Sequence, residues 1–239
     1  MPEPKTFFVH TPVFPLYSEV RSLMKILQNE VSKSDLLKFM SAVWDQTGTP
    51  QNPVDWSDPD QWIEERLTAK NKQIAQLIWT GSNKAINPRH VYGSYLFING
   101  FRLLIPDSSD LLRITEKGAK FLNEDSVAVR EIDEAEGMPK LLSILAAHSP
   151  AKRGDLLSEW GEFLLNNSKY GTKSTISDTL RRRILNLIER GYIIRTTPPP
   201  ESPGLFLADH FLDYGGCGLQ CEGHDFGWVH DHHLLSLIG

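Results

Sequence analysis

The segment KSTISDTLRRRILNLIERGYIIR, residues 173–195, carries the clearest structural pattern in this chain. Apolar side chains recur in it every three or four residues, which predicts a helix over 174–190 with one buried stripe. The members of this stripe are Ile176, Leu180, Ile184, Leu187 and Ile188. Gly191 is expected to end the helix. At about 100° per residue, the opposite and exposed face is expected to carry Thr175, Thr179, Arg182 and Asn186.

Basic and hydroxyl side chains surround the start of this predicted helix. Arginine and asparagine can each make two hydrogen bonds to a base edge, whereas lysine and threonine readily bind phosphates. Helix-turn-helix proteins contact DNA at this point of their recognition helix. The candidate DNA-binding residues of this half are therefore Lys169, Tyr170, Thr172, Lys173, Thr175, Arg181, Arg182 and Asn186. Arg182 is expected to point away from the apolar stripe, with Arg181 and Arg183 on its flanks. The alternative interpretation is a solvated helix face without a partner.

The net charge of −5 at first argues against a nucleic-acid partner, because an acidic surface repels DNA. The charge is unevenly distributed along the chain, however. Residues 140–195 contain ten lysines and arginines and five acidic residues, a net charge of +5, so the remainder of the chain carries −10. A basic region on an acidic chain is typical of a specific DNA binder rather than of a general DNA coat.

Predicted helices and strands follow a similar order in both halves of the chain. In the second half, helices are expected over 138–147, 152–165 and 174–190, followed by extended segments at 192–196 and 205–208. In the first half, helices are expected over 17–28, 34–43, 58–66, 70–79 and 88–100. A hairpin of 103–105 with 111–114 and a short helix over 115–122 come next. Helices followed by a hairpin are the order of a winged helix.

The expected fold is therefore mainly α, formally α+β, with two tandem winged-helix domains, short β-hairpin wings and an irregular C-terminal tail. The expected divisions are an N-terminal segment 1–16, a first domain 17–123, an acidic linker or connecting helix 124–136, a second domain 137–209 and the tail 210–239.

Polar and aromatic side chains also lie before the predicted helix 88–100, at the equivalent place in the first half. The candidates for DNA contact here are Lys84, Arg89, His90 and Tyr92. The ring of Tyr92 is suited to stack on an extruded or modified base. The alternative is a capped helix whose aromatic rings fill the core, which is the expected position of Tyr95.

The sequence predicts no catalytic residue and no cofactor. Glycine-rich phosphate loops and nucleophile elbows are absent, and the one Glu-x-Lys pattern, Glu3 to Lys5, has no Asp before it. The tail holds a weak candidate zinc site in Cys217, Cys221 and His224, with further imidazoles at His230, His232 and His233. Its spacing matches no standard zinc module, so an irregular tail is preferred to a zinc-dependent activity.

Several stretches resemble the N-terminal DNA-recognition region of Mrr-like restriction proteins. In the first half these are WDQTGTPQNPVDWSDPDQWI, IWTGSNKAINPRHVYGSYLF and LLRITEKGAKFL. In the second half they are EIDEAEGMPKLLSILA, RGDLLSEWGEFL and KSTISDTLRRRILNLIERGYI, and the resemblance spans residues 17–208. It implies tandem DNA-recognition modules coupled to a Mg²⁺-dependent nuclease that, in many relatives, acts on modified foreign DNA. The Asp and Glu-x-Lys of that nuclease are not found after Leu207, so the resemblance carries over DNA binding and not cleavage.

The resulting expectation is the non-catalytic recognition module of a type II or type IV restriction endonuclease. Its partner would be double-stranded DNA, which would be methylated if the restriction system is modification-dependent. A homodimer fits this role. The alternatives are a winged-helix protein-interaction module, a transcription regulator, or a zinc-binding tail. No apolar run approaches the ~18 residues that span a bilayer. The N-terminus lacks a signal-peptide layout, and the two cysteines lie together near the C-terminus. The sequence therefore predicts a cytoplasmic protein without a membrane partner.

Overall fold

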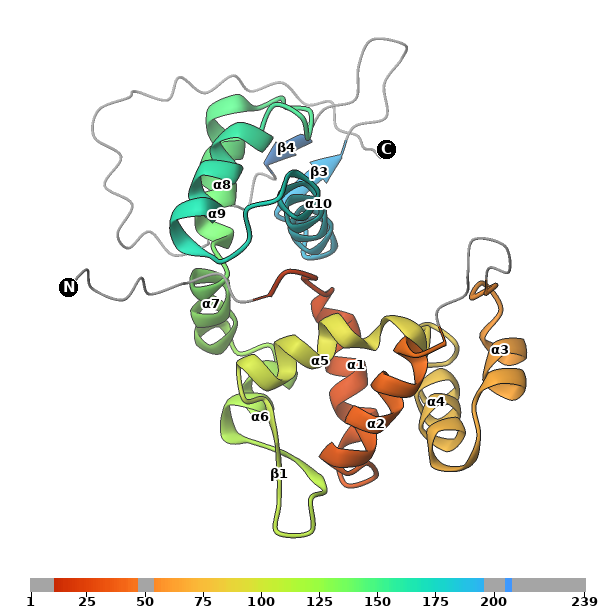
Figure 1. The fold of residues 1–239 in the computed structure, drawn as a ribbon. Coiled ribbons are helices and arrows are strands. Elements are labelled where there is room, and N and C mark those ends of the chain that lie inside the picture. Colours follow the sequence, from red (N-terminus) through yellow and green to blue (C-terminus); the bar gives the residue numbers. More distant parts are fainter. Residues whose placement is uncertain (1–10, 47–53, 196–204, 208–239) are drawn as a thin grey trace, which may run out of the picture. The chain divides into compact units, whose positions relative to one another are not determined.

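The computed structural model describes residues 11–46, 54–195 and 205–207. The chain divides into two compact units, an N-terminal unit that ends at Glu136 and a C-terminal unit that begins at Gly137 (Figure 1). Within these described residues both units are mainly helical, and each contains one antiparallel two-stranded sheet. The expected mainly α class is confirmed. In the part of the chain that the structure describes, no helix has the length and apolarity to cross a bilayer.

Helices form most of the N-terminal unit. Its α-helices before the sheet are α1 (Tyr17–Leu27), α2 (Lys33–Trp44), α3 (Pro59–Arg66), α4 (Ala69–Gly81) and α5 (Val91–Gly100), with a 3₁₀ turn, η1 (Pro88–His90), before α5. The hairpin of β1 (Leu104–Pro106) and β2 (Leu112–Ile114) follows, and then come α6 (Glu116–Leu122) and α7 (Ser126–Ala135). Several of these helices begin at polar caps, since side chains of Ser32, Asp58 and Thr115 accept hydrogen bonds from first-turn amides.

The core of the N-terminal unit contains a cluster of aromatic rings. Phe97 lies at its centre, with ring centroids 5.6 Å from Phe14, 5.4 Å from Tyr17 and 5.8 Å from Phe121. All four side chains are almost completely buried. Phe14 lies in the N-terminal segment that the sequence separates from the first domain, so the structure extends this unit toward the N-terminus.

The acidic segment 124–136 also belongs to the N-terminal unit. It forms α7, and two of its carboxylates are completely buried rather than solvated. The Tyr17 hydroxyl donates to Asp133 Oδ1 at 2.7 Å, and the Thr11 hydroxyl donates to Glu136 Oε1 at 2.7 Å. Buried carboxylates need such donors to offset the loss of hydration. The segment is therefore a packed helix rather than a linker.

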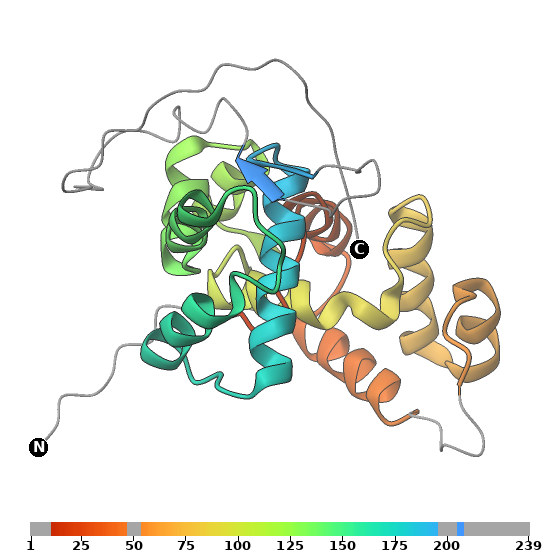
Figure 2. The same cartoon turned by 90° about the horizontal axis from the view of Figure 1, so that it is seen from above.

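In the described residues of the C-terminal unit, three helices precede a hairpin. They are α8 (Met138–His148), α9 (Leu157–Asn167), α10 (Lys173–Glu189), β3 (Ile193–Arg195) and β4 (Leu205–Leu207). The sheet lies at the C-terminal end of α10 (Figure 2). Trp160 of α9 and Leu180 of α10 are completely buried, as are Leu141 and Leu145 of α8. The three expected helices and both extended segments are present, with ends shifted by a few residues.

In both units, a residue between the first and second helices forms an isolated β-bridge to a residue in or next to the hairpin. In the N-terminal unit, Ser32 follows α1 and bridges to Leu111, next to β2. In the C-terminal unit, Ala151 follows α8 and bridges to Leu205 of β4. The Ala151 amide donates to the Leu205 carbonyl with an N···O distance of 3.2 Å, and the Leu205 amide donates to the Ala151 carbonyl at 2.7 Å. Each unit thus has a helix, a bridging residue, further helices and a hairpin. By this order, α5 and α10 hold equivalent positions directly before the hairpin.

Gly118 marks a close approach between α6 and the backbone of Leu103, the residue before β1, in the N-terminal unit. A methyl carbon at this position would lie 2.1 Å from the Leu103 carbonyl oxygen, which itself accepts the Thr115 amide at 3.1 Å. We therefore expect Gly118→Ala to lower the free energy of unfolding by about 2–3 kcal/mol, measured by urea denaturation. Gly100→Ala is the control, because no neighbouring atom lies within 4 Å of the added carbon. A Gly118→Ala protein as stable as the control would contradict this packing.

Candidate nucleic-acid interface

The start of α10 presents basic and hydroxyl side chains to solvent. Lys169, Thr172 and Lys173 are all exposed. The Thr172 hydroxyl caps the helix by accepting the Thr175 amide at 3.3 Å, and it lies 2.8 Å from the Thr175 hydroxyl. The first amides of a helix and its dipole favour anions, so the two lysines extend a local field that is already positive. Tyr170 is half-buried, with its ring 5.9 Å from the Lys169 Nζ.

One acidic residue organises the arginines of the exposed face of α10. Arg182 Nε donates to Asp178 Oδ2 at 2.8 Å, and Arg181 Nη2 lies 3.5 Å from Asp178 Oδ1. The Arg181 side chain is 48% exposed and the Arg182 side chain 35%. Arg181 therefore faces solvent more than Arg182, which corrects the expectation that Arg182 alone points away from the core. Asp178 contacts both guanidinium groups in the N-terminal half and middle of α10 and offsets part of their charge.

Thr179 and Asn186 are completely buried, so the prediction that they lie on the exposed face is wrong. Asn186 cannot contact DNA from this position. Together with Arg183, which is also buried, these residues form a polar stripe beside the apolar one. The Thr179 hydroxyl accepts Trp160 Nε1 at 3.1 Å, and the Arg183 guanidinium carbon lies 5.6 Å from the Trp160 ring centroid. Because α10 packs against both α9 and β3, its buried sector is wider than one apolar stripe.

Lys84 of the N-terminal unit is committed to an ion pair. Its Nζ lies 2.7 Å from Asp60 Oδ2, and Trp79 Nε1 donates to Asp60 Oδ1 at 3.0 Å. The hydrogen bonds from Lys84 and Trp79 lower the pKa of Asp60, so this carboxylate stays charged. A phosphate would have to compete with Asp60 for Lys84, as it would with Asp178 for Arg181 and Arg182.

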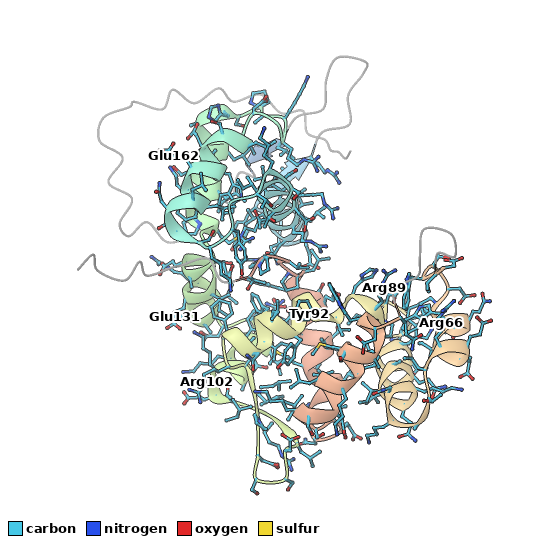
Figure 3. All side chains as sticks on the ribbon, in the orientation of Figure 1. Arg66, Arg89, Tyr92, Arg102, Glu131 and Glu162 are labelled. Carbon is cyan, nitrogen blue, oxygen red and sulfur yellow. The ribbon has the colours of Figure 1, made fainter. Side chains whose placement is uncertain are left out.

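Arg89 and Tyr92 lie near the start of α5 (Figure 3). The Arg89 guanidinium carbon lies 4.1 Å from the Trp56 ring centroid, and partial burial lowers the pKa of Arg89. Asn87 fixes this arrangement, because its side chain accepts the Arg89 amide and donates to the Trp56 carbonyl, both at 3.1 Å. Tyr92 is 51% exposed, whereas Tyr95 is half-buried and burial raises its pKa.

Arg89, His90 and Tyr92 border a groove against α2, which we call the aromatic groove. Its volume is about 550 Å³. The lining residues are Leu37, Met40, Ser41, Val43 and Trp44 of α2, together with Pro88, Arg89, His90, Val91 and Tyr92. Trp44 is 75% exposed and Leu37 42%. The sequence does not predict this groove, although α2 carries more apolar residues than one buried stripe requires.

A metal site is not found in the part of the chain with described positions, where no three His, Cys, Asp or Glu side chains gather. The candidate zinc ligands Cys217, Cys221 and His224, and the other histidines of the tail, lie outside the described residues. Comparison of the chain with protein-family models, with curated proteins and with solved structures gave no match. The two surfaces, at α10 and at the aromatic groove, are therefore interpreted from their own chemistry.

Proposed function

We propose that the chain binds duplex DNA through the exposed N-terminal end of α10. The observation that carries this proposal is the presence of exposed Lys169 and Lys173 at the start of α10, with exposed Arg181 about two turns farther along the same helix. Cations placed around helix amides bind phosphates, which supply most of the affinity of proteins for DNA. The hydroxyl groups of Thr172 and Thr175 add neutral phosphate or base contacts at the same place.

We further propose that both units are winged helices. The shared order of helix, bridging residue, helices and hairpin supports this assignment. In a helix-turn-helix protein the recognition helix enters the major groove with its N-terminal residues on the bases. In the C-terminal unit that helix is α10, so Lys169, Lys173 and Arg181 would hold phosphates. Thr175 and Arg182 would then face base edges.

The acidic remainder of the chain favours a selective role. Outside residues 140–195 the net charge is −10, which weakens long-range attraction to bulk DNA. With the resemblance to Mrr-like proteins, this supports recognition of modified DNA in a restriction system as the biological role. Titration of matched methylated and unmethylated duplexes tests that role. Tighter binding of the methylated duplex would support it, whereas equal affinities would remove modified DNA from the proposal and leave DNA binding in place.

Removal of the acidic charge from the proposed surface should strengthen DNA binding. Asp178→Asn frees the charges of Arg181 and Arg182 and removes a carboxylate that repels phosphates. We expect about three- to tenfold tighter binding of a short duplex at low salt, measured by fluorescence anisotropy. Glu162→Gln is the matched control, since Glu162 is an exposed residue of α9 with the same charge (Figure 3). Equal effects of the two variants, or weaker binding by Asp178→Asn, would place the DNA elsewhere.

A further inference from the structure

The aromatic groove combines flat apolar surface with positive charge. The rings of Trp44 and Tyr92 are among the most exposed large apolar side chains of the described residues. Arg89 and His90 also border the groove, and no carboxylate is among the lining residues that the structure describes. In a chain with a net charge of −5, this charge pattern suits a ligand that is both aromatic and anionic.

Arg89 is held in place before any ligand arrives. Its guanidinium group lies over the Trp56 ring, and Asn87 ties the backbone of both residues together. Such an arginine needs little further ordering to bind a phosphate, because its planar donors are already oriented. The ring of Trp56 in turn packs against the buried Trp62, with centroids 5.2 Å apart. The positive side of the groove is therefore built on the core of the N-terminal unit.

The position of the groove within its unit gives a second argument. It lies at the start of α5, and α5 has the same place in chain order as α10. The start of α10 carries exposed lysines and threonines, whereas the start of α5 carries an arginine, a histidine and a tyrosine. The two units thus present different chemistry at equivalent places. The start of α10 is suited to the phosphate backbone of duplex DNA, whereas the start of α5 is suited to the flat face of an exposed aromatic ring.

We propose, resting on the DNA binding proposed above, that the aromatic groove takes one unpaired nucleobase of DNA. The base stacks on the exposed surface of Trp44 and Tyr92, and Arg89 binds the phosphate next to it. Aromatic side chains bind unpaired bases in this way without requiring a particular sequence. The groove volume of about 550 Å³ falls within the range of sites for ligands of this size. An apolar peptide or a second copy of the chain would use the same rings but would leave Arg89 without an anionic partner from the ligand.

The test compares the full chain on two duplexes that differ only by one unpaired thymine in the middle of one strand. We expect the duplex with the unpaired base to bind about tenfold more tightly in anisotropy titrations. Trp44→Ala should reduce this ratio to about one and leave the affinity for the paired duplex unchanged within about twofold. Trp44→Phe should retain part of the preference, because it keeps an aromatic face. Both variants alter an exposed side chain, and Val127→Ala on α7 is the control for loss of an exposed apolar residue elsewhere.

The outcomes separate this inference from the proposed function. Lys173→Ala should weaken the binding of both duplexes equally and keep their ratio. Salt-dependent binding of both duplexes with equal affinity by the wild-type chain would overturn the inference and leave duplex binding intact. Binding of neither duplex would overturn both proposals. A dimer that dissociates on Trp44→Ala, without any preference for the unpaired base, would assign the groove to a second copy and contradict the inference.

Discussion

Replacement of Trp160 by alanine is expected to lower the free energy of unfolding of the C-terminal unit by about 3–5 kcal/mol. The side chain is completely buried between α9 and α10. Its loss leaves a cavity and removes the donor to the Thr179 hydroxyl. It also removes the ring that packs near the guanidinium group of Arg183, which is itself fully buried. Because domains are stable by only about 5–15 kcal/mol, this loss should also reduce DNA binding through α10.

Urea unfolding followed by near-ultraviolet circular dichroism measures this change. Leu165→Ala is the control on the same helix, since Leu165 is 56% exposed and its loss should cost less than about 0.5 kcal/mol. Trp160→Phe should have an intermediate effect, because it keeps most of the apolar volume but loses the N–H donor. Equal stability of the Trp160→Ala and Leu165→Ala proteins would show that α9 and α10 do not share this core.

The second large effect is expected on DNA affinity. The combined variant Lys169→Ala, Lys173→Ala and Arg181→Ala removes three exposed cations from the proposed surface. We expect about 100-fold weaker binding of a short duplex at low salt, because each of the three charged contacts contributes about 1 kcal/mol. The stability of the protein should change little, since these side chains are exposed and support no core contact.

A charge-matched variant distinguishes local contacts from net charge. Lys140→Ala, Lys152→Ala and Arg153→Ala together remove the same charge from exposed positions of the same unit, but outside α10. This variant should weaken binding much less than the first, by about threefold through long-range attraction alone. Equal losses in the two variants would mean that DNA responds to the overall charge and that α10 is not the binding surface.

The helices and hairpins could be predicted from the sequence because each has a local signal. Apolar periodicity marks α10, and polar caps such as Thr115 mark helix starts. The bridges at Ser32 and Ala151 could not be predicted, because a single pair of residues has no sequence pattern. Nor could the attachment of α7 to the N-terminal unit, since its carboxylates pair with Thr11 and Tyr17, more than 100 residues earlier in the chain.

The surface of α10 could be predicted only in part. Its start is exposed as expected, because Lys169 and Lys173 lie before the helix packs against its neighbours. The middle of the helix departs from the prediction for a physical reason. Thr179 and Asn186 are polar, yet hydrogen bonds allow their burial: the Thr179 hydroxyl accepts from Trp160 of α9, and Asn186 Oδ1 accepts from Arg190 at the end of the same helix. Apolar periodicity does not detect such buried polar residues. The aromatic groove escaped prediction for the opposite reason, because exposed Trp44 looks like a core residue in the sequence.

Salt dependence measures most directly whether α10 binds DNA through phosphates. The equilibrium constant of the wild-type chain for a short duplex is determined over a series of salt concentrations. If three or four cations contact phosphates, the logarithm of this constant should fall against the logarithm of the salt concentration with a slope of about −3. The combined variant Lys169→Ala, Lys173→Ala and Arg181→Ala should bring that slope close to zero. A wild-type affinity that does not change with salt, or no binding at low salt, would contradict the account.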